Sequence, residues 1–249
     1  MPLRETEAIV LRTYRLGEAD KIVSLFTRQF GRLRAVAAGA QRPKSRYGGT
    51  LEPLTYVRLW LFERENRDLL RLNSAELAES FFTMQGDYRV HLAAQYVAEV
   101  AERLLPEREV NERAFRLLLA VLRGLKAHKE IERPLIYFNY WLLRLAGFLP
   151  DFDRCAACGR PFQDEAAFCE TDSLRLACSR CRAGFASREI SVADVALMQR
   201  LRQLPLEKWM AEEANPAALR PLRRLLESWV ERSAEKKLIT RELLDQEED

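Results

Sequence analysis

Four of the five cysteines are arranged as two Cys-x-x-Cys pairs. Cys155 and Cys158 form the first pair and Cys178 and Cys181 the second, with nineteen residues between the pairs. This spacing is typical of sites in which four thiolates bind one Zn²⁺ ion. Each pair brings two sulfur atoms to the ion through a tight turn, and the intervening chain folds back to complete a tetrahedron. We therefore predict one structural zinc ion per chain.

Other roles for the cysteines fit the pattern less well. Disulfides are not expected, because the N-terminus lacks the apolar core of a signal peptide. A redox-active pair would stand alone in a βαβ context, and iron–sulfur clusters use more closely clustered cysteines. Cys169 lies between the pairs and is expected to be a small buried side chain, or a ligand if one assignment fails. His91 and His128 lie in predicted helices and are not expected to bind the metal, since four thiolates already fill its first shell.

The sequence contains none of the common catalytic motifs. A phosphate-binding GxxxxGK[ST] loop, GxGxxG, HExxH and GxSxG are all missing from the chain. Asp151 and Asp153 are the one carboxylate pair that suggests a metal-dependent nuclease, but at the end of a helix such residues are more often capping and turn residues. We therefore predict that the protein is not an enzyme.

Basic residues are concentrated near the N-terminus. Residues 1–62 carry eleven Lys and Arg side chains against five Asp and Glu, a net charge of +6, which leaves −3 for the rest because the total is +3. Between Asp20 and Glu52 lie seven basic residues and no acid. Such a local field attracts polyanions whatever the overall charge. The alternative is a solvated, arginine-rich face without a ligand.

Aromatic residues are interleaved with these basic residues. Phe26, Phe30 and Tyr47 lie within the basic stretch, and Tyr14 precedes it. Cations that neutralise phosphates and aromatic faces that stack bases are the composition of a sequence-tolerant nucleic-acid groove. Phe26 lies among apolar residues and is expected in the core. The residues favoured for binding nucleic acid are Arg42, Lys44 and Arg46 of the predicted loop, with Arg32 and Arg34 on the hairpin that follows Gly31.

The elements that must position these cations are short β-strands. Alternating and β-branched runs predict five of them, separated by Gly, Asn and Pro: Thr6–Leu16, Lys21–Phe30, Arg32–Ala38, Tyr56–Arg64 and Asp68–Glu76. Five short strands in about eighty residues favour a small OB-fold barrel, and an SH3-like barrel gives nearly the same pattern. The segment 39–53 is predicted to be a loop.

From about residue 84 the apolar period changes to that of helices. Helices are predicted from Tyr88 to Leu104, after Asn111, around Pro134, after Ser191 and after Asn215. We expect these five helices to form one bundle, and the acidic tail from residue 242 to 249 to be frayed. The predicted fold is α+β and multidomain: an OB-fold domain over 1–80 and an all-α helical domain over 81–249, with the zinc knuckle inserted at about 151–188.

Composition agrees with a folded protein outside membranes. The chain has 249 residues, of which 48% are hydrophobic and 31% are charged, which excludes a disordered chain. No apolar run approaches the roughly 18 residues that a membrane-spanning helix needs. We expect a soluble, cytoplasmic protein.

Several motifs resemble those of the bacterial recombination mediator RecO. They are Asp20-Lys21-Ile22-Val23-Ser24-Leu25-Phe26-Thr27, Phe30-Gly31-Arg32-Leu33-Arg34, Ala38-Gly39-Ala40-Gln41-Arg42-Pro43-Lys44-Ser45-Arg46, Leu51-Glu52-Pro53, Ala75-Glu76-Leu77, Leu145-Ala146-Gly147-Phe148-Leu149-Pro150 and the run from Cys155 to Gly159. The resemblance covers nearly the whole chain, more loosely after residue 190. Gln41 departs from it, because a third basic residue is common there.

The resemblance implies a function that fits the residues. RecO-like proteins bind single- and double-stranded DNA, anneal complementary strands, and work with RecR, often with RecF, to load RecA onto strands coated by single-strand-binding protein. The resemblance implies a nucleoid-associated protein. The positions that it assigns to DNA binding are Lys21, Arg32, Arg34, Arg42, Lys44 and Arg46. The family also binds the acidic, hydrophobic C-terminal tail of that protein, for which a groove near Tyr137–Phe148 with Arg144 is expected here. Without the resemblance, an RNA-binding or transcription-associated zinc-ribbon adaptor would explain the same barrel and cysteines.

Overall fold

The computed structural model describes residues 3–62, 69–170, 173–182, 187–213 and 215–247. The chain forms two compact units, one made of Met1–Ile131 with Ala234–Asp249 and the other of Glu132–Ser233. The first unit contains β1 (Leu3–Leu16), β2 (Asp20–Thr27), β3 (Gly31–Ala37), β4 (Thr55–Phe62), β5 (Leu69–Ser80), the 3₁₀ helix η1 (Phe82–Gly86), α1 (Tyr88–Leu104), α2 (Glu112–His128) and α7 (Ile239–Gln246). The second contains α3 (Glu132–Leu145), β6 (Ala167–Glu170), β7 (Leu176–Ala177), β8 (Ser187–Ile190), α4 (Val192–Leu201), α5 (Leu206–Met210) and α6 (Pro216–Ala234).

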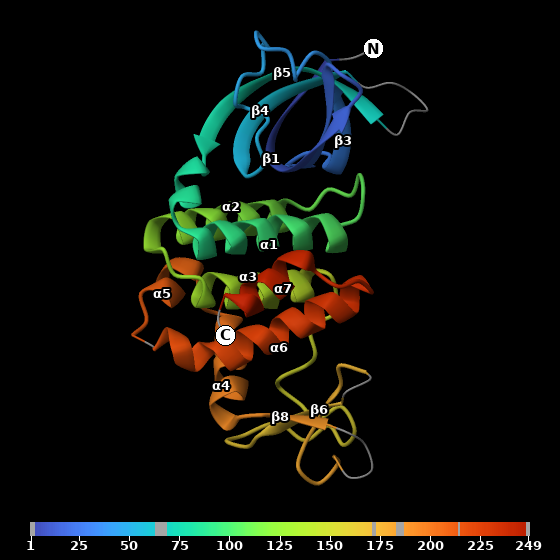
Figure 1. Cartoon of the computed structure of the whole chain (residues 1–249). Helices are drawn as coiled ribbons and strands as arrows, with labels where there is room; N and C mark the ends of the chain where they lie inside the picture. Colours follow the sequence, from blue (N-terminus) through green and yellow to red (C-terminus); the bar gives the residue numbers. More distant parts are fainter. Residues whose placement is uncertain (1–2, 63–68, 171–172, 183–186, 214, 248–249) are drawn as a thin grey trace. The chain divides into compact units, whose positions relative to one another are not determined.

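The five N-terminal strands form a closed barrel in the order β1-β2-β3-β5-β4 (Figure 1). β4 pairs back to β1 antiparallel from Leu3↔Phe62 to Ile9↔Tyr56, while β3 and β5 pair in parallel. This is the five-stranded OB-type architecture that the turn spacing predicted. β5 runs on to Ser80, four residues beyond its predicted end, because its last residue pairs with Thr55 of β4. The predicted strand ends Arg64 and Asp68 lie outside the described residues.

Strict alternation along the strands builds the interior of the barrel. In β3 the side chains of Leu33, Ala35 and Ala37 are buried, whereas Arg34 between them is exposed. β4 follows the same rule, with Leu59 fully buried and its neighbour Arg58 exposed. Because successive side chains point to opposite faces of a strand, the cations stay on the outer surface.

Helices α1 and α2 lie beside the barrel in the first unit (Figure 1). Asp87 caps α1 by accepting from the N–H of Val90, and Asn111 caps α2 by accepting from that of Ala114, as predicted for Asn111. The ring of Phe115 in α2 lies 5.9 Å from that of the barrel residue Phe26. The helices therefore bury their apolar faces against the strands.

The C-terminal segment forms a helix rather than a frayed tail. α7 extends to Gln246, and the side chain of Leu244 is fully buried. Its first turn is capped from α1, because the carboxylate of the buried Glu99 accepts from both the N–H and the hydroxyl of Thr240, at 3.0 and 2.7 Å. The prediction of fraying failed because this cap comes from a residue 141 positions earlier.

The second unit surrounds a buried ionic cluster. Arg223 of α6 has no exposed surface and pairs with Glu132 of α3 at 2.6 Å and with Glu227 at 2.5 Å. Helices α1 and α2 group with the barrel, whereas α3, α4 and α6 group with the cysteine segment, and the single five-helix bundle stays a prediction. The domain boundary at residue 80 stays a prediction. Among the described helices, none is long and apolar enough to cross a bilayer.

Candidate metal centre and nucleic-acid interface

The four paired cysteines converge on one point. The sulfur atoms of Cys155, Cys158, Cys178 and Cys181 all lie within 4.8 Å of one another, and those of Cys158 and Cys178 are 4.0 Å apart. Four sulfurs each about 2.3 Å from a central ion would be separated by about 3.8 Å. The cysteines could therefore hold a tetrahedral metal ion after small adjustments.

Backbone turns position these sulfurs. Gly159 follows the first pair with a positive φ of 71°, and its N–H donates to the carbonyl of Cys155 at 2.9 Å. In the second pair the N–H of Cys181 donates to the carbonyl of Cys178 at 3.0 Å. The two turns meet where the N–H of Cys178 points at the sulfur of Cys155, at 3.4 Å. Only glycine adopts the left-handed conformation at position 159 without strain.

The pKa values of the clustered thiols favour the binding of a cation. Burial opposes ionisation of Cys155, but backbone N–H groups of Cys158, Cys178 and Ala157 outweigh it and lower its pKa to about 6. Hydrogen bonds that the Cys181 thiol makes with Cys158 and Cys178 raise its pKa to about 12. A first thiolate therefore forms readily, and the last needs a positive charge at the centre. A divalent ion supplies that charge.

The remaining candidate ligands lie elsewhere. Cys169 on β6 is buried, its pKa is raised by burial, and it is not part of the cluster of sulfurs. His91 and His128 belong to α1 and α2 of the first unit, and neither joins the cluster. Asp151 accepts from the N–H of Asp153 at 2.8 Å, and the carboxylate of Asp153 pairs with Arg202 at 2.6 Å. Asp151 thus takes part in the turn that was expected, and Asp153 additionally forms an ion pair.

On the barrel, the loop between β3 and β4 holds three of the six predicted cations, Arg42, Lys44 and Arg46. Arg42 and Lys44 are exposed, and among the described residues no carboxylate oxygen lies within 4.0 Å of either. Arg46 is also exposed and sits over the Tyr47 ring, with its guanidinium carbon 5.0 Å from the ring centre. Their charges are therefore available to a ligand outside the chain.

The loop that carries them is well anchored. Consecutive turns run through it. The N–H of Ser45 donates to the carbonyl of Arg42, and the N–H of Gly48 donates to the carbonyl of Ser45. Tyr47 is 2% exposed, and its hydroxyl donates to the Leu72 carbonyl of β5 at 2.9 Å. At the start of the loop, the side chain of Gln41 donates to the Asp20 carbonyl at 2.6 Å. The residue that departs from the family pattern thus fastens the loop to β2.

The cations on the strands are paired within the chain. Arg32 is 16% exposed at its side chain, pairs with Glu107 at 3.1 Å and donates to the Leu105 carbonyl at 2.9 Å. Glu107 also lies 3.7 Å from Arg34. Lys21 pairs with Glu52 at 3.3 Å. The structure thus divides the six predicted residues into three exposed cations on a loop and three cations with carboxylate partners.

The aromatic residues of the basic stretch are mostly unavailable for stacking. Phe26 and Tyr47 are buried, and Phe30 is half-buried with Arg4 over its ring at 5.6 Å. Tyr14, which is 41% exposed, remains as an aromatic face near the basic residues in sequence. The burial of Tyr47 was missed because a tyrosine among glycines and basic residues carries no periodic signal.

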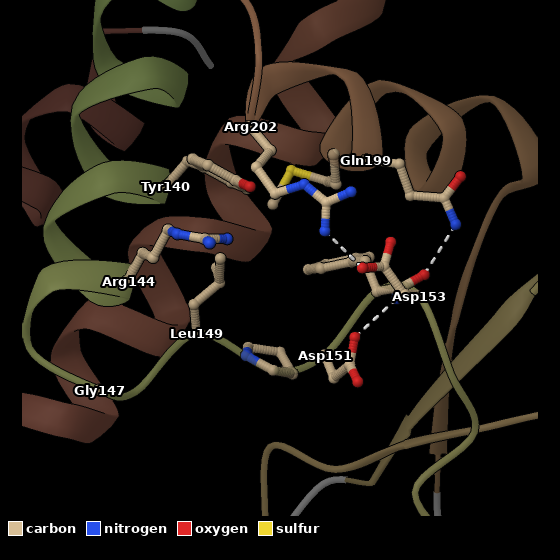
Figure 2. Close-up of a pocket in the computed structure, with 11 residues that line it drawn as sticks. Tyr140, Arg144, Gly147, Leu149, Asp151, Asp153, Gln199 and Arg202 are labelled. Atoms are coloured by element: carbon tan, nitrogen blue, oxygen red, sulfur yellow. Dashed lines mark hydrogen bonds and ion pairs between the residues drawn. The ribbon is translucent and has the colours of Figure 1, made fainter. Parts of the chain in front are cut away.

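A cavity of about 440 Å³ lies within the second unit (Figure 2). Tyr140 and Arg144 of α3 line one side of the cavity, and Arg202 lines the other. Leu149 and Asp151, from the segment that follows α3, also line it. The guanidinium of Arg144 also lies 5.7 Å from the ring centre of Trp141. The sequence pointed to Arg144 but missed Arg202 and its neighbours Met198 and Gln199, because α4 is separated from α3 by the cysteine segment.

Comparison with known proteins gives consistent matches along the chain. Residues 1–81 match the family model "Recombination protein O N terminal" and residues 85–242 match "Recombination protein O C terminal". Proteins named DNA repair protein RecO are similar along nearly their whole length. The one from Koribacter versatilis is 42% identical over 98% of both chains, and that from Bifidobacterium adolescentis is 34% identical over 98% of this chain and 100% of the relative. The one from Anaeromyxobacter sp. (strain K) is 31% identical over 96% of this chain and 94% of the relative. The chain therefore belongs to the RecO family of DNA repair proteins.

Proposed function

We propose that this chain is a DNA-binding recombination mediator in DNA repair. It anneals complementary single strands and, with RecR and in some cases RecF, helps to load RecA onto strands coated by single-strand-binding protein. The observation that carries this proposal is the anchored loop of the barrel, on which Arg42, Lys44 and Arg46 are exposed to solvent. Membership of a DNA repair family supports it.

Annealing requires electrostatics rather than bond chemistry. Two complementary strands repel each other through their phosphates, and cations that neutralise some of them lower this barrier. Since arginine and lysine contact phosphates and leave base edges free, base pairing and stacking then drive the strands together. A loop held by Tyr47 and Gln41 presents its cations with little ordering cost on binding.

The six basic residues are expected to contribute unequally. In this proposal most of the phosphate binding comes from Arg42, Lys44 and Arg46, because no carboxylate among the described residues pairs with them. The side chains of Arg34 and Lys21 are 45% and 23% exposed, so they can exchange their acidic partners for phosphate. Arg32 contributes least directly, since it is largely buried and holds β3 to the segment after α1.

The cavity in Figure 2 supports the partner expected in the helical region. An acidic, hydrophobic C-terminal tail of single-strand-binding protein would place its carboxylates at Arg144 and an apolar side chain against Leu149 and Tyr140. Arg202 is already paired with Asp153, so Arg144 is the cation that the proposal assigns to the tail.

We also propose that the metal of the four cysteines is a single structural zinc ion. Zinc prefers four tetrahedral thiolates, and such closed sites keep no position for a substrate. The protein would then act in the cytoplasm, at the nucleoid, as a mediator without catalytic turnover.

Annealing of two complementary DNA strands coated with single-strand-binding protein tests the proposal. The variant Arg42→Glu/Lys44→Glu/Arg46→Glu is expected to anneal at least tenfold more slowly. For single strands, the slope of log binding constant against log salt should fall by about two units, at roughly 0.7 per phosphate contact.

The matched control reverses three exposed arginines of the same unit outside the loop, Arg58, Arg113 and Arg116. This control keeps the overall charge change and should retain most of the activity. Equal losses in both variants would show that net charge matters and the loop does not. Unchanged annealing in the loop variant would refute the proposed role of the loop.

A further inference from the structure

The second cysteine pair lies in an arginine-rich segment of the second unit. From residue 173 to 188 the sequence contains four arginines and no acidic residue. All four, Arg175, Arg180, Arg182 and Arg188, are exposed. Most other arginines of this unit are paired: Arg160 lies 2.7 Å from Glu165, Arg200 2.6 Å from Glu212, and Arg223 2.6 Å from Glu132. Within the described part of the chain, the four arginines have no carboxylate oxygen within 4.0 Å.

The knuckle fixes the positions of three of these arginines. Arg180 lies between Cys178 and Cys181, and the N–H groups of Cys181 and Arg182 both donate to the carbonyl of Cys178, at 3.0 and 3.1 Å. The side chain of Arg175 donates to the carbonyl of Ala156, which lies between Cys155 and Cys158, at 3.2 Å. The backbone that carries the three side chains is therefore held by the same turns that gather the sulfurs.

The guanidinium of Arg182 is itself oriented. Its central carbon lies 4.2 Å from the centre of the ring of Phe168, a buried residue of β6. The ring covers part of the guanidinium, and the rest of the side chain remains accessible to a ligand because the residue is exposed. A planar guanidinium in this arrangement can donate two hydrogen bonds to a phosphate or stack on a base.

Strand register places Arg188 on the opposite face of the small sheet. Arg188 pairs with Cys169, whereas Phe168 pairs with Ala177 on one side and Glu189 on the other. Directly paired residues share a face and neighbours along a strand do not, so Arg182 and Arg188 lie over different faces. The face of Phe168 also carries Glu189 and Glu170, and the carboxylate of Glu170 accepts from the hydroxyl of Ser173.

The arginines have an alternative role, which is to neutralise the thiolates. Four thiolates around a divalent ion carry a net charge of −2, which nearby cations would stabilise. Within the described part of the chain, however, the sulfurs of Cys155 and Cys178 receive backbone N–H groups, and no guanidinium N–H lies within 4.0 Å of a sulfur. The three side chains are thus directed to other groups or to solvent.

We propose that Arg175, Arg180 and Arg182 form a second phosphate-binding surface, on the cysteine knuckle, for the single-stranded DNA that the barrel loop binds. The inference rests on the proposed function. The knuckle surface adds phosphate contacts of its own, so a strand long enough to reach it binds more tightly and with a steeper salt dependence. The metal acts on DNA binding only by holding the knuckle backbone that presents the arginines.

Binding of the full-length, metal-loaded protein to fluorescently labelled oligothymidylate tests this. Anisotropy titrations at several salt concentrations would compare wild type, Arg180→Glu/Arg182→Glu, the control Arg188→Glu/Arg232→Glu, and the barrel-loop triple variant. Arg232 is an exposed arginine of α6. The knuckle variant should bind about tenfold more weakly, and its salt slope should fall by about 1.4 units at roughly 0.7 per contact. The control should stay within about twofold of wild type.

Metal content by mass spectrometry and thermal melting accompany each titration. If the knuckle variant loses its metal, Arg180→Gln/Arg182→Gln replaces it, with a smaller loss of affinity expected at full metal content. A wild type that does not bind DNA would refute the proposed function itself. If the wild type binds DNA through the barrel loop, and a metal-loaded knuckle variant keeps the affinity and the salt slope of wild type, this inference alone is overturned.

Discussion

The barrel and the cysteine module are stabilised by different means. The barrel has a core of thirteen buried residues, from Ala8 to Leu72, contributed by all five strands and the loop after β3. The cysteine module has three strands of four, two and four residues. A small sheet of this kind cannot bury enough apolar surface to fold unaided. The barrel loop that we propose for DNA binding therefore lies on a part of the molecule that needs no metal, whereas the knuckle arginines lie on a part that does.

This contrast also separates two kinds of basic surface. The barrel loop is held by hydrogen bonds such as that from Tyr47 to Leu72, whereas the knuckle arginines depend on turns around the sulfurs. Removing the metal should therefore weaken one surface and spare the other. Three measurements test the difference, in order of decreasing effect.

The largest effect is expected at the metal site. Replacing Cys178 with serine removes one ligand, and metal binding contributes folding energy on the order of 10 kcal/mol in such modules. Hydrogen exchange measured by mass spectrometry should show loss of protection in 151–182 with protection retained in β1–β5. Metal content should fall, while Cys169→Ser, outside the cluster, should keep it. Full metal content in the Cys178 variant would refute the ligand assignment.

A truncation in the barrel core should destabilise the barrel and leave the metal site intact. Leu59 is fully buried in β4, so Leu59→Ala should lower the free energy of unfolding by about 2–5 kcal/mol. Urea denaturation followed by circular dichroism measures this, with metal content expected to remain that of wild type. Leu77→Ala is the matched control, because Leu77 is 51% exposed and its loss should cost about 0.5 kcal/mol or less. Similar losses in the two variants would contradict a core-stabilised barrel.

The smallest effect is expected at the anchor of the loop. Tyr47→Phe removes the hydroxyl that donates to the Leu72 carbonyl and leaves the buried ring, so the free energy of unfolding should fall by about 0.5–1.5 kcal/mol. Chemical denaturation detects this, and Tyr14→Phe on the exposed part of β1 serves as the control. If DNA affinity also falls, the order of the loop matters for binding. A Tyr47 variant as stable as the control would show that the hydroxyl does not anchor the loop.

Local patterns predicted the elements and the metal ligands well. The alternation in β3 and β4 reflects one buried face, and it identified both strands within about two residues. The two Cys-x-x-Cys pairs identified the sulfur cluster because each pair closes over a four-residue turn. Asn111 and Ser191 were identified as helix caps because capping depends on residues three positions apart.

Contacts between distant residues were not predictable in the same way. The burial of Tyr47, the pairing of Arg32 with Glu107 and the cap that Glu99 provides to α7 each depend on segments far apart in the chain. Hydrophobic periodicity gives the apolar face of a helix but not the surface that covers it. For this reason the periodicity did not show that α1 and α2 group with the strands of the barrel.

The sequence by itself determined the strands, the main helices, the four clustered cysteines and the family, because each depends on short spacings or on motifs along the chain. Only the tertiary structure decided which basic residues are available. Arg32 and Arg42 look alike in the sequence, but the first is neutralised by Glu107 and the second is exposed on an anchored loop. The physical reason is that an ion pair forms wherever the fold brings opposite charges within a few ångströms, whatever their separation along the chain.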